Sequence, residues 1–365
     1  MGIRIINGGF LTTIQDMGRF GYQETGMAVS GVMDTRSAAL ANILVGNEEG
    51  EAVVEITMMG PVIEFTEDNI VALTGGDLGA KLDGKPMPRY EAVYVKAGQA
   101  LSFAGMFSGS RAYLAFAGGL SVPLVMGSKS TNLKSKVGGV EGRKLGAGDE
   151  IGFAAPKMWL PNMSERKLTP DDFSAREVTL RVVLGPQDDC FTKKGISTFL
   201  NTPYKISNEY DRMGCRMEGA TIEHKNGGDI ITDGISFGAV QVPSHGNPIV
   251  MMADHQTTGG YTKIAGVISV DLPRLAQCRP GDTIWFHEVS VGEAQDLYCK
   301  QKEELAALKE RLNAPQEPAS DAQAVALAAA ANADAVGWSD QGTYRVIVNG
   351  EEFLVNLKKE VKRFR

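Results

Sequence analysis

The chain has 365 residues, of which 43% are hydrophobic and 22% are charged, and its formal net charge is −7. This length is enough for two domains with sizeable cores. The acidic balance argues against a nucleic-acid partner, because phosphate binding needs a basic face. No apolar stretch approaches the roughly 20 residues that cross a bilayer, and the N-terminus lacks the pattern of a signal peptide. We therefore expect a cytoplasmic protein that binds neither nucleic acid nor membrane.

Short strand patterns predominate up to about residue 290, and most have Gly, Pro or Asp nearby. A helix is predicted over residues 33–45, with Asp34 as its N-cap and Gly46 at its C-terminus. So many short strands are typical of a barrel or a sandwich. The clearest strands are predicted at residues 53–56, 62–65, 70–73, 92–95, 112–116 and 179–184.

One local pattern, a glycine-containing turn that leads into a strand, recurs at residues 98–103, 148–153 and 281–286. The second copy is expected to close one barrel and the third to close another. This places a linker between them at residues 156–177, where prolines and charged residues interrupt the strand pattern.

The C-terminal part begins with an amphipathic helix predicted over residues 291–313, with Leu297, Leu305, Leu308 and Leu312 on one face. Residues 314–340 are rich in alanine and proline and read as a mobile linker. Residues 341–365 contain a β-hairpin signal with an Asn-Gly pair typical of a type I′ turn. A lone hairpin is marginal in water, so we expect it to dock on another surface.

The four cysteines and four histidines are widely spaced, without a C-x-x-C or H-x-x-x-H pattern. We therefore expect small buried cysteines, no disulfide framework and no metal bound by this chain. The glycine-rich stretch at residues 75–79 lacks the lysine of a phosphate-binding loop. If ATP is used, a partner is expected to contribute to its binding.

Polar side chains surround the pair Gly259-Gly260 in residues 253–265. Thr257, Thr258, Tyr261 and Lys263 supply hydrogen-bond donors of different reach, and glycine permits positive φ and close backbone approach. One interpretation is a site that grips a small anionic or carbonyl-bearing substrate. The alternative is a polar β-turn between two strands.

Several further motifs are distributed along the chain, at residues 11–19, 29–34, 40–47, 55–57, 73–77, 127–131, 185–189, 211–214, 256–265 and 271–273. Together they resemble the biotin-dependent carboxyltransferase-like proteins, a family that includes allophanate hydrolase subunit 2, KipA and the C subunit of 5-oxoprolinase (PxpC). The resemblance runs from about residue 3 to residue 288.

This resemblance implies a mainly β fold with two linked cyclophilin-like β-barrel domains and few helices. The expected domains are a first barrel at 1–155, a linker at 156–177, a second barrel at 178–290, a helix at 291–313, a second linker at 314–340 and the hairpin at 341–365. The hairpin looks like the opening strands of a biotin carrier domain. It is either a remnant of one or a docking element for a partner, and we favour docking.

The resemblance also implies a function: the C subunit of a 5-oxoprolinase-type hydrolase, which opens a cyclic amide with ATP. Its expected partners are a KipI-like (PxpB-like) B component and a LamB/YcsF-like A component. One alternative is a carboxyltransferase component that uses biotin, as in urea carboxylase. The other is a KipA-like regulator that binds a KipI-like protein without catalysis.

Residue roles follow from the same resemblance. Lys263 is the predicted cation for an anionic group, against the alternative of a surface lysine. Thr257 and Thr258, with the amides of Gly259 and Gly260, are predicted to cradle an oxygen atom. Tyr261 and Gln256 are assigned to the same site.

Other candidates lie far from this segment. Arg212 is either a clamp for a substrate carboxylate or half of a structural ion pair with Asp211, and we lean to the ion pair. The N-terminal segment is predicted to reach the cleft between the barrels through Ser30, Asp34 and Arg19, together with Gln15 and Asp16. Neither His245 nor His255 is chosen as a general base.

Overall fold

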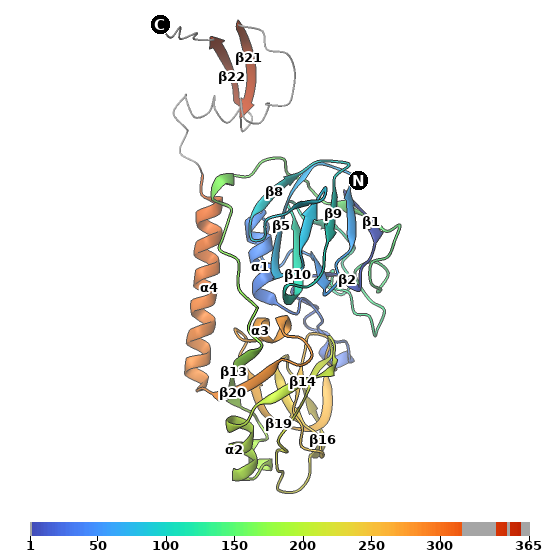
Figure 1. Ribbon diagram of the computed structural model, residues 1–365, viewed down its shortest axis with the longest axis vertical. Helices are drawn as coiled ribbons and strands as arrows, with labels where there is room; N and C mark the ends of the chain where they lie inside the picture. The colour runs from blue at the N-terminus through green and yellow to red at the C-terminus, as the bar shows by residue number, and fades with distance from the viewer. Residues whose placement is uncertain (1, 316–340, 349–350, 359–365) are drawn as a thin grey trace. The chain divides into compact units, whose positions relative to one another are not determined.

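The computed structural model describes residues 2–315, 341–348 and 351–358, and the chain divides into two compact units, residues 1–314 and 315–365 (Figure 1). The first unit is built mainly of β-strands with few helices, which confirms the predicted fold class. No helix among the described residues is long and apolar enough to cross a membrane.

Residues 2–153 form two sheets that enclose a hydrophobic core. The seven-stranded sheet has the order β11-β12-β1-β4-β9-β6-β7, and the five-stranded sheet has the order β2-β3-β10-β5-β8. The strands of the first sheet are β1 (Gly2–Asn7), β4 (Val62–Phe65), β6 (Ala80–Leu82), β7 (Lys85–Pro86), β9 (Ala100–Phe103), β11 (Leu120–Ser121) and β12 (Glu150–Phe153). Those of the second are β2 (Leu11–Gln15), β3 (Val53–Thr57), β5 (Asn69–Asp77), β8 (Ala92–Val95) and β10 (Ser108–Phe116).

The five-stranded sheet is covered on both faces. Val71 and Leu73 of β5 face the core between the sheets, whereas Ile70 and Ala72 pack toward helix α1 (Thr35–Leu44). This is the period-two alternation of a strand buried on both sides. The helix begins after Asp34, whose carboxylate accepts a hydrogen bond of 2.8 Å from the Ser37 amide, so the predicted N-cap is confirmed.

Residues 177–288 form a closed ring of strands with the order β13-β20-β14-β15-β18-β17-β19. The ring closes because β13 pairs with β20 in parallel and with β19 antiparallel. Strand β16 pairs with β19 at residues 258–261, before the part of β19 that pairs with β13 at residues 265–267. The strands are β13 (Glu177–Leu184), β14 (Tyr204–Tyr210), β15 (Gly214–Gly219), β16 (Asp229–Gly234), β17 (Ala239–Val242), β18 (Ile249–Met251), β19 (Thr258–Val267) and β20 (Thr283–Glu288).

Short helical elements connect these strands. Helix α2 (Lys193–Asn201) places Phe199 in the core of the ring, and helix α3 (Leu272–Gln277) contacts β10 and α1 of the N-terminal sheets. The single-turn elements are η1 (Gln23–Thr25), η2 (Met163–Glu165) and η3 (Asp188–Cys190). The ring and the N-terminal sheets are therefore packed together within one unit.

The glycine turn that recurs in the sequence has the same backbone conformation in all three copies. Gly98, Gly148 and Gly281 have φ angles of 89°, 91° and 89°, and each precedes a strand, β9, β12 or β20. Such angles favour glycine because a side chain is strained there. Strand β12 pairs with β1 and β20 pairs with β13, so the second and third copies each return the chain to the first strand of its own sheet.

Helix α4 (Val291–Asn313) confirms the predicted amphipathic helix. It starts with a capping box, in which the Ser290 side chain accepts from the Glu293 amide and the Glu293 side chain accepts from the Ser290 amide. Leu305 and Leu312 are buried against α1, whereas Leu297 is only half-buried. The helix thus seals the face of α1 opposite the sheet.

The second unit contains a hairpin of β21 (Gln341–Val348) and β22 (Glu351–Lys358), in which Val348 pairs with Glu351. The predicted hairpin is therefore confirmed as a strand pair. Its Asn-Gly turn and the alanine-rich tract of residues 322–335 lie outside the described residues. Docking of the hairpin stays a prediction.

The four cysteines are free thiols. Cys215 and Cys278 are buried as expected, and burial raises the pKa of both. The expectation of buried cysteines is wrong for Cys299, which is exposed on α4, and for Cys190, which is partly exposed beside the ring.

Candidate active site

A cavity of about 450 Å³ lies beside the pair formed by β16 and β19. Its wall is formed by β16, by the segment between β16 and β17, and by β19. Gln23 from the N-terminal segment and Pro186 from the loop after β13 complete it. The predicted site residues Lys263 and Thr257 are both part of this wall, together with Asp233, Ile235, Ser236 and Ala239.

Lys263 is the buried cation of the cavity. Its side chain is only 5% exposed, and its Nζ donates a hydrogen bond of 2.9 Å to Oδ2 of Asp233, whose side chain is 54% exposed. This hydrogen bond lowers the pKa of Asp233. An ammonium group carries three donors, and Asp233 takes one of them. The alternative of a surface lysine is therefore wrong, and Lys263 retains donors for an anion or a carbonyl oxygen.

Gln187 joins Lys263 to Asp233. Its Oε1 accepts from the Lys263 amide at 3.1 Å, and its Nε2 donates to Asp233 Oδ2 at 3.1 Å. The loop can approach β19 because residue 185 is glycine. A Cβ there would lie 2.8 Å from the Ala265 nitrogen and 2.9 Å from the Lys263 oxygen. Close backbone contact thus positions Gln187 beside the cation.

The glycine pair lies inside strand β19, where Gly259 pairs with Asp233 of β16. Among the described residues, positive φ is not found at Gly259 or Gly260. The alternative of a β-turn is therefore wrong, and the positive φ that glycine permits does not occur here. The glycine at 259 has a steric reason instead, because a Cβ would lie 2.6 Å from Cδ1 of Ile235.

The other predicted residues of this segment are more exposed. Gln256 and Thr258 are exposed, and Tyr261 is 41% exposed opposite Asp229. None of the three is part of the cavity wall, although all lie on or next to β19. Their assignment to the site stays a prediction.

Arg212 forms a buried ion-pair network between the strand ring and the N-terminal sheets. Its Nε and Nη2 donate to Asp254 at 2.9 and 3.1 Å, and its Nη1 contacts Glu55 of β3. Its Nη2 also donates to the Gly31 carbonyl. Burial opposes the charge, but the carboxylates of Asp254 and Glu55 outweigh it and raise the pKa of Arg212.

The structural ion pair favoured for Arg212 is therefore present, but its partners differ from the prediction. Asp211 instead accepts hydrogen bonds from the backbone amides of Met213 and Gly214, at 2.7 and 3.1 Å. A carboxylate one residue away is poorly placed to face the guanidinium, whereas Glu55 and Asp254 reach it from other elements. Each nitrogen of Arg212 is already engaged by the protein, which argues against the role of a substrate clamp.

Asp34 and Gln277 form a second buried polar contact between the strand ring and the N-terminal part of the unit. Gln277 Nε2 donates to Asp34 Oδ2 at 2.8 Å, and its Oε1 accepts from the Ser110 and Arg111 amides at 3.1 and 3.0 Å. Burial raises the pKa of Asp34. Asp34 thus caps α1 and binds α3, and it lies outside the cavity wall. The substrate-binding role predicted for it stays a prediction.

Arg19 and Ser30 are also buried in structural contacts. Arg19 donates to the carbonyls of Val125 and Ser130 at 2.9 and 2.8 Å, and burial lowers its pKa. Ser30 accepts from Asn132 at 2.9 Å and has a φ angle of 61°. Neither residue is part of the cavity wall, and the assignment of both to the site stays a prediction. Gln23, from the same N-terminal segment, does line the cavity.

Asp16 and Gln15 hold the N-terminal segment against residues 128–131. Asp16 accepts from the Ser128 hydroxyl at 2.7 Å and from the Lys129 amide at 2.6 Å. Gln15 donates to the Thr131 carbonyl at 3.0 Å. These contacts hold the motif at residues 11–19 against the motif at residues 127–131.

Neither His245 nor His255 lines the cavity. His255 is buried, its ring Nδ1 lies 2.7 Å from the Gln256 carbonyl oxygen, and burial lowers its pKa. His245 is exposed. Among the described residues, no cluster of three or more His, Cys, Asp or Glu side chains is arranged to hold a metal ion.

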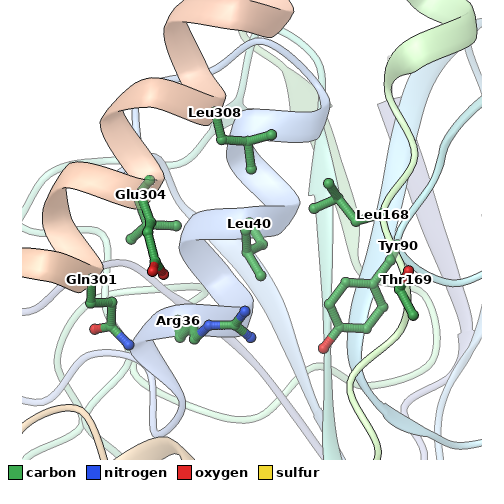
Figure 2. Close-up of a pocket in the computed structure, with 9 residues that line it drawn as sticks. Arg36, Leu40, Tyr90, Leu168, Thr169, Gln301, Glu304 and Leu308 are labelled. Carbon is green, nitrogen blue, oxygen red and sulfur yellow. The ribbon is translucent and has the colours of Figure 1, made fainter. Parts of the chain in front are cut away.

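A second cavity, of about 270 Å³, lies between α1, α4 and residues 168–169 (Figure 2). Leu40, Leu168 and Leu308 supply its apolar wall, and Arg36 and Glu304 lie at its edge. Arg36 is paired with Asp171, which also accepts a hydrogen bond of 2.9 Å from the Tyr90 hydroxyl. We call this cavity between α1 and α4 the seam. None of the predicted site residues lines it, and the Arg36 and Tyr90 side chains in it are already paired.

Sequence reasoning missed Asp233, Ser236 and Gln23 as parts of the cavity. Asp233 carries no local signal, because an acidic residue before a glycine is ordinary turn chemistry. Gln187 belongs to one of the recurrent family motifs, at residues 185–189, and this was the available signal.

Residues 25–288 match the family described as carboxyltransferase domain, subdomain A and B. The chain is 36% identical to the C subunit of 5-oxoprolinase from Escherichia coli K12 over 311 residues, which are 85% of this chain and 99% of that protein. It is 39% identical to the C subunit of 5-oxoprolinase from Haemophilus influenzae over 290 residues, 80% of this chain and 92% of that protein.

Among solved structures, the urea amidolyase of K. lactis is similar with a TM-score of 0.78 and 28% identity. The similarity covers 84% of this chain and 20% of that much longer chain. The matched residues 25–288 include the Arg212 network and all of the cavity wall except Gln23. The chain belongs to the carboxyltransferase domain family, subdomains A and B.

Proposed function

We propose that this chain is the C subunit of a 5-oxoprolinase-type hydrolase that opens a cyclic amide at the expense of ATP. The observation that carries the proposal is the similarity to the C subunit of 5-oxoprolinase, which covers 99% of the E. coli protein. The whole of that protein therefore has a counterpart here. In this proposal a KipI-like B component and a LamB/YcsF-like A component complete the enzyme and the ATP site.

The Lys263 cavity supports this function chemically. The substrate 5-oxoproline carries a carboxylate and a lactam carbonyl, and Lys263 has spare N–H donors although its side chain is largely shielded from water. The hydroxyls of Thr257 and Ser236 line the same wall. Donors fixed in this way stabilise the negative charge that develops on the carbonyl oxygen when the amide is attacked.

The seam beneath α4 is the weaker candidate. Helix α4 begins at Val291, beyond the residues 25–288 that match the family. A site shared by the family is expected within the matched range, where all of the Lys263 cavity except Gln23 lies. The side chains of the seam are mainly those that hold α4 on α1.

A carboxyltransferase acting with carboxybiotin is the second candidate, because the chain also resembles a segment of urea amidolyase. The same cavity would then hold the carboxyl group near Lys263. A KipA-like regulator would retain the fold without turnover. The two enzyme functions differ in what they consume, namely ATP with 5-oxoproline or carboxybiotin with urea.

The test is reconstitution. The purified full chain is assayed for ATP-dependent glutamate release from 5-oxoproline, alone and with the two partner components. We expect no turnover by the chain alone and turnover by the complete set. Turnover by the chain alone would contradict the partner requirement. Transfer from carboxybiotin to urea, without glutamate release, would establish the second candidate.

A further inference from the structure

The wall of the Lys263 cavity includes one residue from outside the strand ring. Gln23 belongs to the N-terminal segment, whereas the other described residues that line the cavity lie between Pro186 and Gly266. Gln23 is therefore the point at which the N-terminal part of the unit reaches the proposed site.

Residues 20–28 form a loop that is closed at its neck. The Arg19 amide donates a hydrogen bond of 2.7 Å to the Val29 carbonyl, which brings the two ends of the loop together. Compact loops of this length with adjoining ends are Ω-loops, and they are frequently functional. The neck is fixed to the rest of the unit, because the buried Arg19 guanidinium donates to the carbonyls of Val125 and Ser130. The base of the loop is thus held in place.

Beyond the neck, the loop forms hydrogen bonds only with itself. Residues 20–26 are all exposed, and the backbone amides of Thr25 and Met27 donate to the Tyr22 carbonyl at 3.1 and 3.3 Å. Within the described chain, no hydrogen bond joins residues 20–26 to another element. The loop therefore keeps its own shape without being attached to the strand ring, and its polar groups are free to meet a ligand.

The Gln23 side chain has hydrogen-bond donors to spare. Its Oε1 accepts a hydrogen bond of 3.0 Å from the Gly21 amide. Because only the oxygen of a carboxamide can accept from a backbone N–H, this contact also fixes which end of the group is nitrogen. Nε2 carries two N–H groups, and neither has a partner among the described residues. Since Gln23 lines the cavity, these donors are available to a ligand there, on a side chain that is already oriented.

We infer that Gln23 binds the substrate by donating from Nε2 to the lactam carbonyl oxygen. This inference rests on the proposed function. The substrate 5-oxoproline carries a carboxylate and a lactam carbonyl on one small ring. The buried ammonium of Lys263 suits the carboxylate, because a charge-assisted hydrogen bond is the stronger kind, and the neutral carboxamide of Gln23 suits the neutral carbonyl.

The two contacts together define the ligand. A ring that lacks either the carboxylate or the carbonyl leaves Lys263 or Gln23 without its partner, and such a loss weakens binding. The site therefore selects small cyclic amides that carry a carboxylate, and it draws its two polar contacts from two different parts of the unit.

Two substitutions separate substrate binding from a structural role. Gln23→Glu keeps the size and the acceptor for the Gly21 amide but removes the donors, whereas Gln23→Met removes both. Binding of 5-oxoproline is measured by calorimetry with the wild-type chain and each variant, assembled with both partner components. We expect both variants to lose at least about tenfold in affinity, and Gln23→Glu to bind more weakly because its carboxylate repels the anionic substrate. If Gln23 only held the loop, Gln23→Glu would bind like wild type and Gln23→Met alone would be impaired.

2-Pyrrolidone identifies the oxygen atom that Gln23 binds, because it has the lactam without the carboxylate. Its affinity for the same complexes is measured by competition with 5-oxoproline. Gln23→Met is expected to weaken the binding of 2-pyrrolidone, and Lys263→Met is expected to leave it unchanged. The reverse pattern would place Gln23 at the carboxylate and overturn the assignment.

Gln295→Glu, at an exposed position of α4, is the matched control for the added charge and should bind 5-oxoproline like wild type. Gln23 is itself exposed, so its variants are expected to fold, and thermal unfolding of each chain checks this. Hydrogen exchange of residues 20–28 in the wild-type complex is a second measurement. We expect it to become slower when 5-oxoproline binds, and an unchanged rate would count against contact with the loop.

Failure of the inference is distinguishable from failure of the proposed function. If the wild-type complex releases glutamate but Gln23→Glu binds 5-oxoproline like wild type, the inference about Gln23 is wrong and the proposed function stands. If the complete wild-type complex neither binds nor turns over 5-oxoproline, the proposed function fails and the inference fails with it.

Discussion

Two buried polar regions of this protein differ in how fully their groups are paired. Around Arg212, every guanidinium nitrogen has a partner, either a carboxylate of Asp254 or Glu55 or the Gly31 carbonyl. Around Lys263, the ammonium has one described partner, Asp233. Both regions contain residues of the motifs that resemble the carboxyltransferase family. Only the region around Lys263 has hydrogen-bond donors left to bind a ligand.

Arg212 and Lys263 are both buried cations, so charge and burial do not distinguish a structural residue from a binding residue. The number of unpaired donors does distinguish them. A fully paired cation holds the strand ring to the N-terminal sheets, and any substrate would have to displace a protein partner there. A cation with spare donors at the wall of a cavity meets no such competition. Four predictions test the contrast, from the largest expected effect to the smallest.

Arg212→Met is expected to lower the free energy of unfolding by about 3–5 kcal/mol, because it leaves Glu55 and Asp254 buried without a counter-charge. Urea denaturation of the full chain measures the change. Arg216→Met is the matched control, since Arg216 is 51% exposed and pairs with the exposed Glu209. Equal effects of the two substitutions would refute a structural role for the Arg212 network.

Lys263→Met is expected to reduce turnover of the reconstituted enzyme by at least about tenfold, the order expected for the loss of one charged contact. Folding should be little affected, because Asp233 is largely exposed and can be hydrated. The control is Lys302→Met, which removes a surface ion pair with Glu49. Normal kinetics in a folded and assembled Lys263→Met enzyme would remove Lys263 from the site.

Gly259→Ala and Gly260→Ala form a matched pair of neighbours. The new methyl group at 259 would lie 2.6 Å from Ile235 Cδ1, whereas at 260 the nearest atom is 3.5 Å away. Because the tip of Ile235 can move, we expect a cost of about 1 kcal/mol in transition-state stabilisation at 259 and little change at 260. Steady-state kinetics of both variants decides, and equal rates would show that this part of the wall does not touch the substrate.

The pH dependence of stability is the smallest effect. Burial lowers the pKa of His255 below its ordinary value of 6.5, so the unfolded chain binds the proton more readily than the folded one. Stability from this group is present above pH 6.5 and is lost as the pH falls, by at most about 1.4 kcal/mol per pH unit.

Denaturation at pH values of about 7.5 and 5.5, on either side of the ordinary histidine pKa, compares wild type with His255→Gln. The variant is expected to lose this part of the slope, and the exposed His245→Gln should behave like wild type. A slope unchanged by either substitution would assign the pH dependence to other groups.

Much of the fold is predictable from the sequence because it depends on neighbours along the chain. The Asp34 cap acts on an amide three residues away, and the turns at Gly98, Gly148 and Gly281 need only a positive φ before a strand. The helix over residues 291–313 follows from leucines at helical spacing and a capping box. Such signals are complete within a short window.

The candidate site is predictable only in part, for the same reason. The polar segment at residues 256–265 indicates Lys263 and Thr257, but its glycines suggest a turn where the structure has a strand. Gly259 is required by Ile235, which reaches it only because β16 pairs with β19. A pair of glycines in a sequence therefore indicates that another group packs closely against the backbone there. It does not indicate which group that is.

The sequence by itself determined the clearest strands, the two helices α1 and α4 with the Asp34 cap, and which segment carries site-forming side chains, but not helices α2 and α3. Only the tertiary structure decided which charges meet. Lys263 pairs with Asp233, 30 residues earlier, and Arg212 pairs with Glu55, 157 residues earlier, rather than with the adjacent Asp211. Contacts at such separations are set by strand register and by the packing of the ring on the N-terminal sheets, because neither is encoded within a local window of residues.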